Sequence, residues 1–194
     1  QDFYHVEDRC QSVPLKLLFV GRVCEDKGVM DLIRAGSIIN SKGLKVFVSI
    51  VGGGPETNLF KEECRREGLE NIVIWHGRIP FGPELFKIYR RSDIFILPSR
   101  HEGFPHAILE AMASSVPVLV TKVGGIAAVC SNEEDVLFID KTPENIAYSV
   151  RRVAGDITLR KRLIGNGYKL AEKFIVGENE KKLTEILIEN WNRS

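Results

Sequence analysis

Two glutamates, Glu102 and Glu110, stand in the segment SDIFILPSRHEGFPHAILEAMASSVPVLVTKVGG, which covers residues 92–125. The segment reads as an apolar strand, a loop, a helix that begins near Phe104, and a second apolar strand that ends in a Gly-Gly turn. Such a unit makes a right-handed crossover between two parallel strands. Ligands of open parallel sheets bind at the carboxyl ends of strands, where the loop with Glu102 must lie. Glu110 is expected about two turns into the helix.

Two cations follow an earlier apolar run. Gly21, Arg22 and Lys27 lie in a loop between a strand expected at 15–20 and a helix expected at 28–42. Arginine can bind two phosphate oxygens at once, and lysine adds a compact charge. The GR-x4-KG spacing therefore predicts phosphate binding. The alternative is a pair of solvated loop charges, the usual state of Arg and Lys.

The helix that begins near Phe104 adds an anion site to the same loop. Its free N–H groups and its dipole favour negative charge, and Pro105 fits the first turn because its missing N–H costs nothing there. Phe104, His106 and Ala107 could offer backbone N–H groups to phosphate or sugar oxygens. His106 as a catalytic base is the weaker interpretation.

Glu110 belongs to a helix that is otherwise rich in Ala, Leu, Ile and Met. A carboxylate on the inward face of such a helix needs hydrogen-bond donors, and the hydroxyls of a ribose are suitable donors. The alternative is an exposed helix carboxylate. The glycines at 52–54 lack the G-x-G-x-x-G order of a dinucleotide fingerprint. They predict either a turn that lets backbone approach a ligand or a partner domain, or a plain turn.

Strand and helix patterns alternate along residues 14–140 and position these groups. Strands are expected at 15–20, 44–51, 72–75, 94–97, 116–120 and 136–139. Helices are expected at 28–42, 55–67 and 83–91 and from about residue 104, with Pro55 in the first turn of the second. The alternation predicts an α/β, Rossmann-like three-layer domain with a six-stranded parallel sheet and helices on both faces.

The chain is expected to end in helices and to form one domain. Residues 1–13 read as a linker or irregular lead-in, and residues 141–194 as C-terminal helices. The first of these begins with Thr142 as N-cap and Pro143 at the first position, and others are expected at 157–174 and 178–191. The length of 194 residues suits a single domain.

The bulk composition is that of a soluble globular protein, with 44% hydrophobic and 27% charged residues. A net charge of +1 gives no argument for nucleic acid or an acidic membrane as partner. No apolar run approaches the roughly 20 residues of a membrane span, and the first residues lack the plan of a signal peptide. Four scattered cysteines without a CxxC pair favour reduced thiols in a cytoplasmic protein.

Five segments in order resemble a known family. They are FVGRVCEDKG, VGGGPE, WHGRIP, EGFPHAILEAMA and PVLVTKVGG, and together they span most of residues 15–140. The fourth, in which Glu102 and Glu110 are separated by seven residues, resembles the E-x7-E motif of retaining nucleotide-sugar glycosyltransferases. The chain is thus similar to the donor-binding, C-terminal domain of a GT-B enzyme of glycosyltransferase group 1, or family 4.

The resemblance implies a role for each candidate residue. Glu102 is the catalytic residue: it would contact hydroxyls of the donor sugar and stabilise positive charge near the anomeric carbon. Arg22 and Lys27 would bind the diphosphate, Glu110 the ribose, and the loop at 76–80 the nucleobase, largely through backbone. The donor-binding residues are Gly21, Arg22, Lys27, Arg78, Ile79, Gly103, Phe104, Pro105, His106, Ala107 and Glu110. No Asp-x-Asp motif is present, so no metal and no cofactor are expected.

The resemblance also implies what the chain does and what it works with. It would bind a nucleoside diphosphate sugar and transfer a hexose-type sugar to an acceptor held by an N-terminal acceptor-binding domain. That domain would lie in the same chain or in a separate subunit, because these residues do not supply one, and only it would contact a membrane. The alternatives are a non-catalytic nucleotide-sugar-binding or regulatory module and another GT-B enzyme, such as a nucleotide-sugar epimerase, a family that lacks the pattern EGFP-x3-LEAMA.

The chain departs from the family pattern after the Gly-Gly turn. Ala127 and Ala128 stand where the family usually has a small residue and a glutamate. The sequence SNEEDV replaces a D-G-x-x-G loop, and Ser114-Ser115 replaces a usual Cys/Ala-Gly. These changes bear on the acceptor side of the site more than on donor binding.

Overall fold

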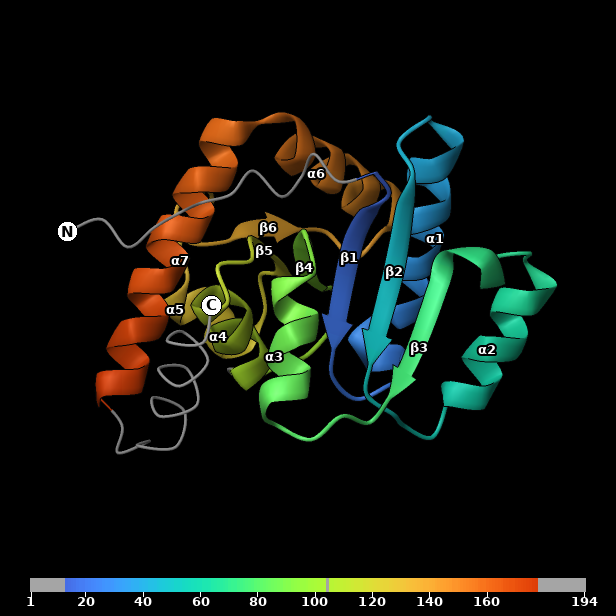
Figure 1. Ribbon diagram of the computed structural model, residues 1–194, viewed down its shortest axis with the longest axis horizontal. Coiled ribbons are helices and arrows are strands. Elements are labelled where there is room, and N and C mark those ends of the chain that lie inside the picture. Colours follow the sequence, from blue (N-terminus) through green and yellow to red (C-terminus); the bar gives the residue numbers. More distant parts are fainter. Residues whose placement is uncertain (1–12, 104, 178–194) are drawn as a thin grey trace.

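A computed structural model describes residues 13–103 and 105–177 of the chain (Figure 1). Residues 1–12 of the linker predicted at 1–13, the helix predicted at 178–191 and Phe104 lie outside these ranges. The strands are β1 (Leu15–Val20), β2 (Val46–Val51), β3 (Val73–Gly77), β4 (Ile94–Leu97), β5 (Val118–Thr121) and β6 (Leu137–Ile139). The helices are α1 (Val29–Ser41), α2 (Thr57–Arg66), α3 (Pro83–Arg90), α4 (His106–Ala113), α5 (Gly124–Val129), α6 (Pro143–Gly155) and α7 (Ile157–Gly177).

The strands form one sheet in the order β3-β2-β1-β4-β5-β6, and every neighbouring pair is parallel. This confirms the predicted six-stranded, Rossmann-like α/β domain. The chain winds outward from β1 to β3 and then returns to place β4 on the other side of β1. The strand order therefore reverses between β1 and β4, and such a switch point is where open parallel sheets bind ligands.

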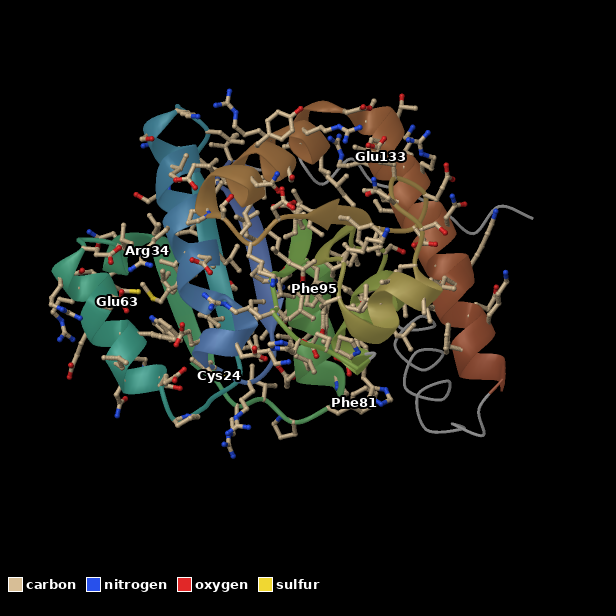
Figure 2. All side chains as sticks on the ribbon, turned by 180° about the vertical axis from the view of Figure 1, so that it is seen from behind. Cys24, Arg34, Glu63, Phe81, Phe95 and Glu133 are labelled. Carbon is tan, nitrogen blue, oxygen red and sulfur yellow. The ribbon has the colours of Figure 1, made fainter. Side chains whose placement is uncertain are left out.

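Helices cover both faces of the sheet. Figures 1 and 2 show α1 and α6 on one face, where they contact each other, and α3 and α4 contact each other on the opposite face. The helix α7 packs mainly against α4. The central strand β1 is buried from both sides, with Leu17, Leu18 and Phe19 fully inaccessible to water. Such continuous apolar strands are typical of a parallel sheet between helical layers.

Charged side chains tie α1 to α2 at the surface. The Arg34 guanidinium lies 2.5 Å from a Glu63 carboxylate oxygen and 2.6 Å from one of Glu67. Figure 2 shows Arg34 and Glu63 approaching each other from the two helices. Within the described residues, no helix has the length and apolarity needed to cross a membrane.

Several predicted boundaries are confirmed closely. The strands β1 and β4 have the predicted bounds, and α6 begins as expected, with Pro143 at its first position and the Thr142 hydroxyl accepting a hydrogen bond from the Asn145 N–H at 3.3 Å. The other strands and helices differ from the prediction mostly by one or two residues at their ends, where fraying and capping decide the boundary.

Two helix starts were predicted too early. The chain makes a turn at 54–57, in which the Thr57 hydroxyl bonds both the N–H and the carbonyl of Gly54, so α2 begins at Thr57 and Pro55 precedes it. Pro105 has an extended conformation, with ψ near 131°, and is therefore the N-cap of α4 rather than part of its first turn. Glu110 consequently lies only about one turn into that helix.

Two elements were misjudged from the sequence. The Gly-Gly pair at 124–125 begins a short helix, α5, rather than only a turn; glycine is a poor helix former, so nothing in the pattern indicated it. The strand β3 continues to Gly77, so His76 belongs to the strand and not to the loop after it. A register shift between Ile50 and Val51 lets Val51 pair with Gly77, which adopts a left-handed φ of 71°.

Candidate functional site

The loops that follow β1 and β4 meet at the switch point of the sheet. The Lys27 ammonium, from the first loop, lies 2.7 Å from the Glu102 Oε1 of the second. Lys27 also donates to the His101 carbonyl at 3.1 Å, and the Arg100 N–H donates to the Asp26 carbonyl at 2.7 Å. The fold therefore brings together the cation predicted for phosphate and the carboxylate predicted for the sugar. Their side chains are 20% and 10% exposed, which makes the contact stronger than a fully solvated pair.

A second contact between charged or polar side chains, Asp26 and His101, joins the loop after β1 to the loop after β4. The His101 Nδ1 is 2.7 Å from the Asp26 Oδ1, and the His101 side chain is mostly exposed. The hydrogen bond with His101 holds the pKa of the Asp26 carboxyl below its ordinary value. His101 therefore joins the two loops.

Glu102 is held by its own loop and by β5. The fully buried Ser99 donates its hydroxyl hydrogen to the same Oε1 of Glu102 at 2.7 Å. The Thr121 hydroxyl, at the end of β5, donates to the Ser99 carbonyl at 2.5 Å. The start of α5 completes the support: a Cβ on Gly124 would stand 1.7 Å from the Glu102 carbonyl oxygen, and the Gly125 N–H donates to the Gly103 carbonyl at 2.9 Å.

Glu110 is buried, with 8% of its surface exposed, so the alternative of an exposed helix carboxylate is wrong. Its partner in the protein is Tyr89 on α3, whose hydroxyl donates to Oε2 at 2.9 Å. Burial raises the pKa of the Glu110 carboxyl above its ordinary value, while the hydrogen bond from Tyr89 opposes that shift. The ribose contact predicted for Glu110 remains a prediction.

The start of α4 faces the loop after β4. The Ile108 N–H donates to the Pro105 carbonyl at 3.1 Å, whereas no backbone carbonyl among the described residues accepts from the N–H groups of His106 or Ala107. The start of an α-helix leaves such N–H groups open to an anion, and the anion contact predicted for these two stays a prediction. The His106 side chain is exposed.

An open groove of about 680 Å³ extends from the same edge of the sheet toward β3. It contains four of the predicted donor-binding residues. Its lining is formed by residues 20–22, 51–55 and 78–80, which include Gly21, Arg22, Arg78 and Ile79. Lys27, Glu102 and Glu110 do not line this groove.

The glycines after β2 allow a close backbone approach, but the approach is to this chain's own loop after β1. A Cβ on Gly52 would stand 1.8 Å from the Gly21 carbonyl oxygen, and one on Gly54 would stand 2.0 Å from the Val23 carbonyl oxygen. These residues therefore shape the floor of the groove by letting two loops touch. The prediction of a close approach to a ligand or a partner domain is not needed to explain them.

Tyr89, Ser99 and Thr121 contact the candidate residues or their loop and were not singled out from the sequence. Tyr89 and Glu110 are 21 positions apart, and Thr121 and Ser99 are 22 apart, so no local pattern joins them. Ser99 offered one signal, because a hydroxyl two residues after a strand that leads into a predicted site can bond the site's own side chains.

Gly28 allows a test of the contact between the loops after β1 and β4. It has a left-handed φ of 66°, and a Cβ on it would stand 2.4 Å from the Pro98 carbonyl oxygen. We expect Gly28→Ala to lower the free energy of unfolding by more than the roughly 1–2 kcal/mol that left-handed strain alone costs. Gly43→Ala is the matched control, because Gly43 has a φ of 88° with no neighbouring atom within 4 Å. Equal losses in urea denaturation of the two variants would contradict the close contact between the loops.

Solved structures share this architecture. The C-terminal domain of a glycosyl transferase group 1 family protein, LpcC, from Francisella tularensis superposes with a TM-score of 0.72 at 28% identity, covering 82% of this chain and 85% of that one. Anabaena Alr3699/HepE, solved in complex with UDP, superposes with a TM-score of 0.70 at 23% identity, covering 82% of this chain and 44% of that one, and shows the fold alone. The fold is that of a domain of the GT-B glycosyltransferases.

The sequence defines the family. The model of the family Glycosyl transferases group 1 matches residues 4–170, so the chain belongs to that family. An uncharacterized glycosyltransferase of Methanocaldococcus jannaschii, MJ1607, is 33% identical over 155 residues, which are 79% of this chain and 39% of that protein. The chain spans about two fifths of the length of the curated relatives that it matches first, 39% and 40%.

Proposed function

We propose that this chain is the donor-binding domain of a retaining glycosyltransferase of family 4, which moves a hexose-type sugar from a nucleoside diphosphate to an acceptor. The observation that carries the proposal is the contact between Lys27 and Glu102 at the switch point. The proposed cation for the diphosphate and the proposed carboxylate for the sugar thus lie side by side, which would let them act on the two ends of the bond between sugar and diphosphate.

The site divides into regions that match the parts of a nucleotide sugar. Arg22, Lys27 and the free N–H groups at the start of α4 would hold the diphosphate without a metal ion. Glu102 would lie beside the anomeric carbon, where positive charge develops as the leaving diphosphate departs. Glu110 would accept hydrogen bonds from the ribose, and the groove beside Arg78 and Ile79 would take the nucleobase.

The ion pair gives the site a specific electrostatic arrangement. Without ligand, Glu102 neutralises much of the Lys27 charge. A bound diphosphate would share Lys27 with Glu102. The Lys27 ammonium would then lie between two negative groups, the diphosphate and the Glu102 carboxylate. This arrangement favours a donor whose diphosphate bears an electron-poor carbon on the Glu102 side.

The acceptor is proposed to bind outside these residues, in an N-terminal domain across a cleft, either in the same chain or in a separate subunit. The relatives support this division, since this chain covers two fifths of their length. The chain alone should therefore bind donor but transfer little sugar, because the acceptor must be positioned against the anomeric carbon for the reaction to proceed.

Calorimetric titration with UDP, GDP and ADP tests the proposal directly. We expect at least one of the three to bind, and to bind equally well in EDTA, because cations and a helix N-terminus replace the metal at the diphosphate. Inorganic pyrophosphate is the control for binding through phosphates alone, and it should bind more weakly. Failure of all three nucleotides to bind would overturn the donor site, and a loss in EDTA that Mg²⁺ restores would overturn its metal independence.

A further inference from the structure

The Tyr89 hydroxyl is placed deep in the protein against the carboxylate of Glu110. It donates to Glu110 Oε2 at 2.9 Å and is 3.4 Å from the Ala107 carbonyl oxygen, so the carboxylate is the nearer acceptor. Tyr89 is fully buried and Glu110 is 8% exposed. The described residues give Oε1 of Glu110 no hydrogen bond, and that atom is not among the fully buried unpaired ones. One carboxylate oxygen is thus held by the protein, and the other is left for a ligand.

Aromatic packing fixes the Tyr89 ring independently of its hydroxyl. Its centroid lies 6.3 Å from that of Phe86 and 5.9 Å from that of Phe95, which comes from β4 (Figure 2 labels Phe95). Both distances are in the range of favourable aromatic pairs. The ring is therefore a rigid support, anchored on α3 and on the sheet, that sets the direction of the hydroxyl toward α4.

We propose that Tyr89 is a positioning residue for donor binding: it orients the Glu110 carboxylate so that Oε1 can accept a hydrogen bond from the nucleoside. This inference rests on the proposed function, because it requires that Glu110 bind the nucleoside part of the donor.

The electrostatics of the pair agree with this role. Burial by itself raises the pKa of the Glu110 carboxyl, and a protonated carboxyl would be a poorer acceptor. The Tyr89 hydroxyl and, through its charge, His106 on α4 act in the opposite direction and favour the ionised form. Burial and the neighbouring Glu110 raise the pKa of Tyr89, so its hydroxyl keeps the proton that it donates.

The test removes only the hydroxyl. We expect Tyr89→Phe to weaken UDP, GDP or ADP binding, whichever the wild-type chain binds, by about tenfold, the lower end for a hydrogen bond to a charged group. The pKa of Glu110 should rise, because the ionised form has lost a donor. As the pH is lowered, nucleotide affinity should consequently be lost at a higher pH in the variant than in the wild type. The carboxyl titration of Glu110, followed by carbon-13 NMR and assigned with Glu110→Gln, measures the same shift without ligand.

A double-mutant cycle separates positioning from a structural effect. In the Glu110→Gln background, Tyr89→Phe should change affinity by less than about twofold, because it acts only through the carboxylate. Tyr148→Phe is the matched control, since it removes a hydroxyl from an exposed site on α6 and should change nothing. Thermal unfolding of each variant verifies that the folded fraction is the same.

The possible failures are distinguishable. If the wild type binds nucleotide and Glu110→Gln weakens it, but Tyr89→Phe changes neither affinity nor the Glu110 titration, the inference is wrong and the proposed function stands. Equal losses from Tyr89→Phe in both backgrounds would likewise reduce Tyr89 to a packing residue. If Glu110→Gln leaves affinity unchanged, Glu110 does not bind the nucleoside and the inference falls with that role. Absence of any nucleotide binding to the wild type would overturn both.

Discussion

Replacing Lys27 by alanine should weaken binding of the nucleoside diphosphate by about 1.5–3 kcal/mol, the range for hydrogen bonds to charged groups. Two effects act in the same direction. The diphosphate loses a cation, and Glu102, now without its partner at 2.7 Å, adds an uncompensated negative charge beside it. Arg22→Ala should have an effect in the same range, because Arg22 lines the groove that begins at the end of β1. Calorimetry with UDP, GDP and ADP measures both.

The control for this experiment is Lys45→Ala. Lys45 is exposed and lies just before β2, at the amino end of the sheet, so its loss changes the net charge equally without touching the site. A charge that far away should be screened by salt and have little effect. If Lys27→Ala and Lys45→Ala bind nucleotide as well as the wild type does, Lys27 is not a phosphate ligand.

The second large effect is expected from Glu102→Gln in the proposed enzyme with both a donor-binding and an acceptor-binding domain. Turnover should fall on the order of 10²-fold, the cost of losing one electrostatic stabiliser of a transition state, because charge at the anomeric carbon develops mainly there. Affinity for the free diphosphate should not decrease, since the substitution frees Lys27 from its ion pair. Steady-state kinetics with the nucleotide sugar and calorimetry with the free diphosphate measure the two quantities separately.

Glu110→Gln is the comparison that makes this prediction specific. This substitution should weaken binding of the free nucleoside diphosphate and of the nucleotide sugar alike, because the proposed contact is with the nucleoside. If Glu102→Gln costs as much diphosphate affinity as Glu110→Gln, the roles of the two glutamates are wrongly assigned. Unchanged turnover in Glu102→Gln would show that the carboxylate is not catalytic.

The sequence by itself determined most of the strands and helices, although not α5, and it determined which loops hold the candidate residues. The runs at 15–20 and 94–97 are short, rich in apolar residues apart from Lys16, and followed by loops, which favours buried strands of a parallel sheet. The start of α6 was also predicted correctly, because the preference of Thr142 for the N-cap and of Pro143 for the first helical position depends only on neighbouring residues. The glycines at 52–54 predicted a turn, but they left open whether it serves a close backbone approach or is a plain turn.

The tertiary structure alone decided which of these residues meet. Hydrophobic pattern identifies strands but not their neighbours, so the placement of β4 beside β1, and with it the contact of Lys27 with the loop 74 residues away, had no local signal. Ser99 and Tyr89, whose hydroxyls donate to Glu102 and Glu110, could not be identified from the sequence, for different reasons. Ser99 lies in the same loop as Glu102 but bonds it through a side-chain orientation that only the fixed loop supplies. Tyr89 reaches Glu110 because α3 and α4 pack on the same face of the sheet, and packing between helices depends on the whole core rather than on either helix.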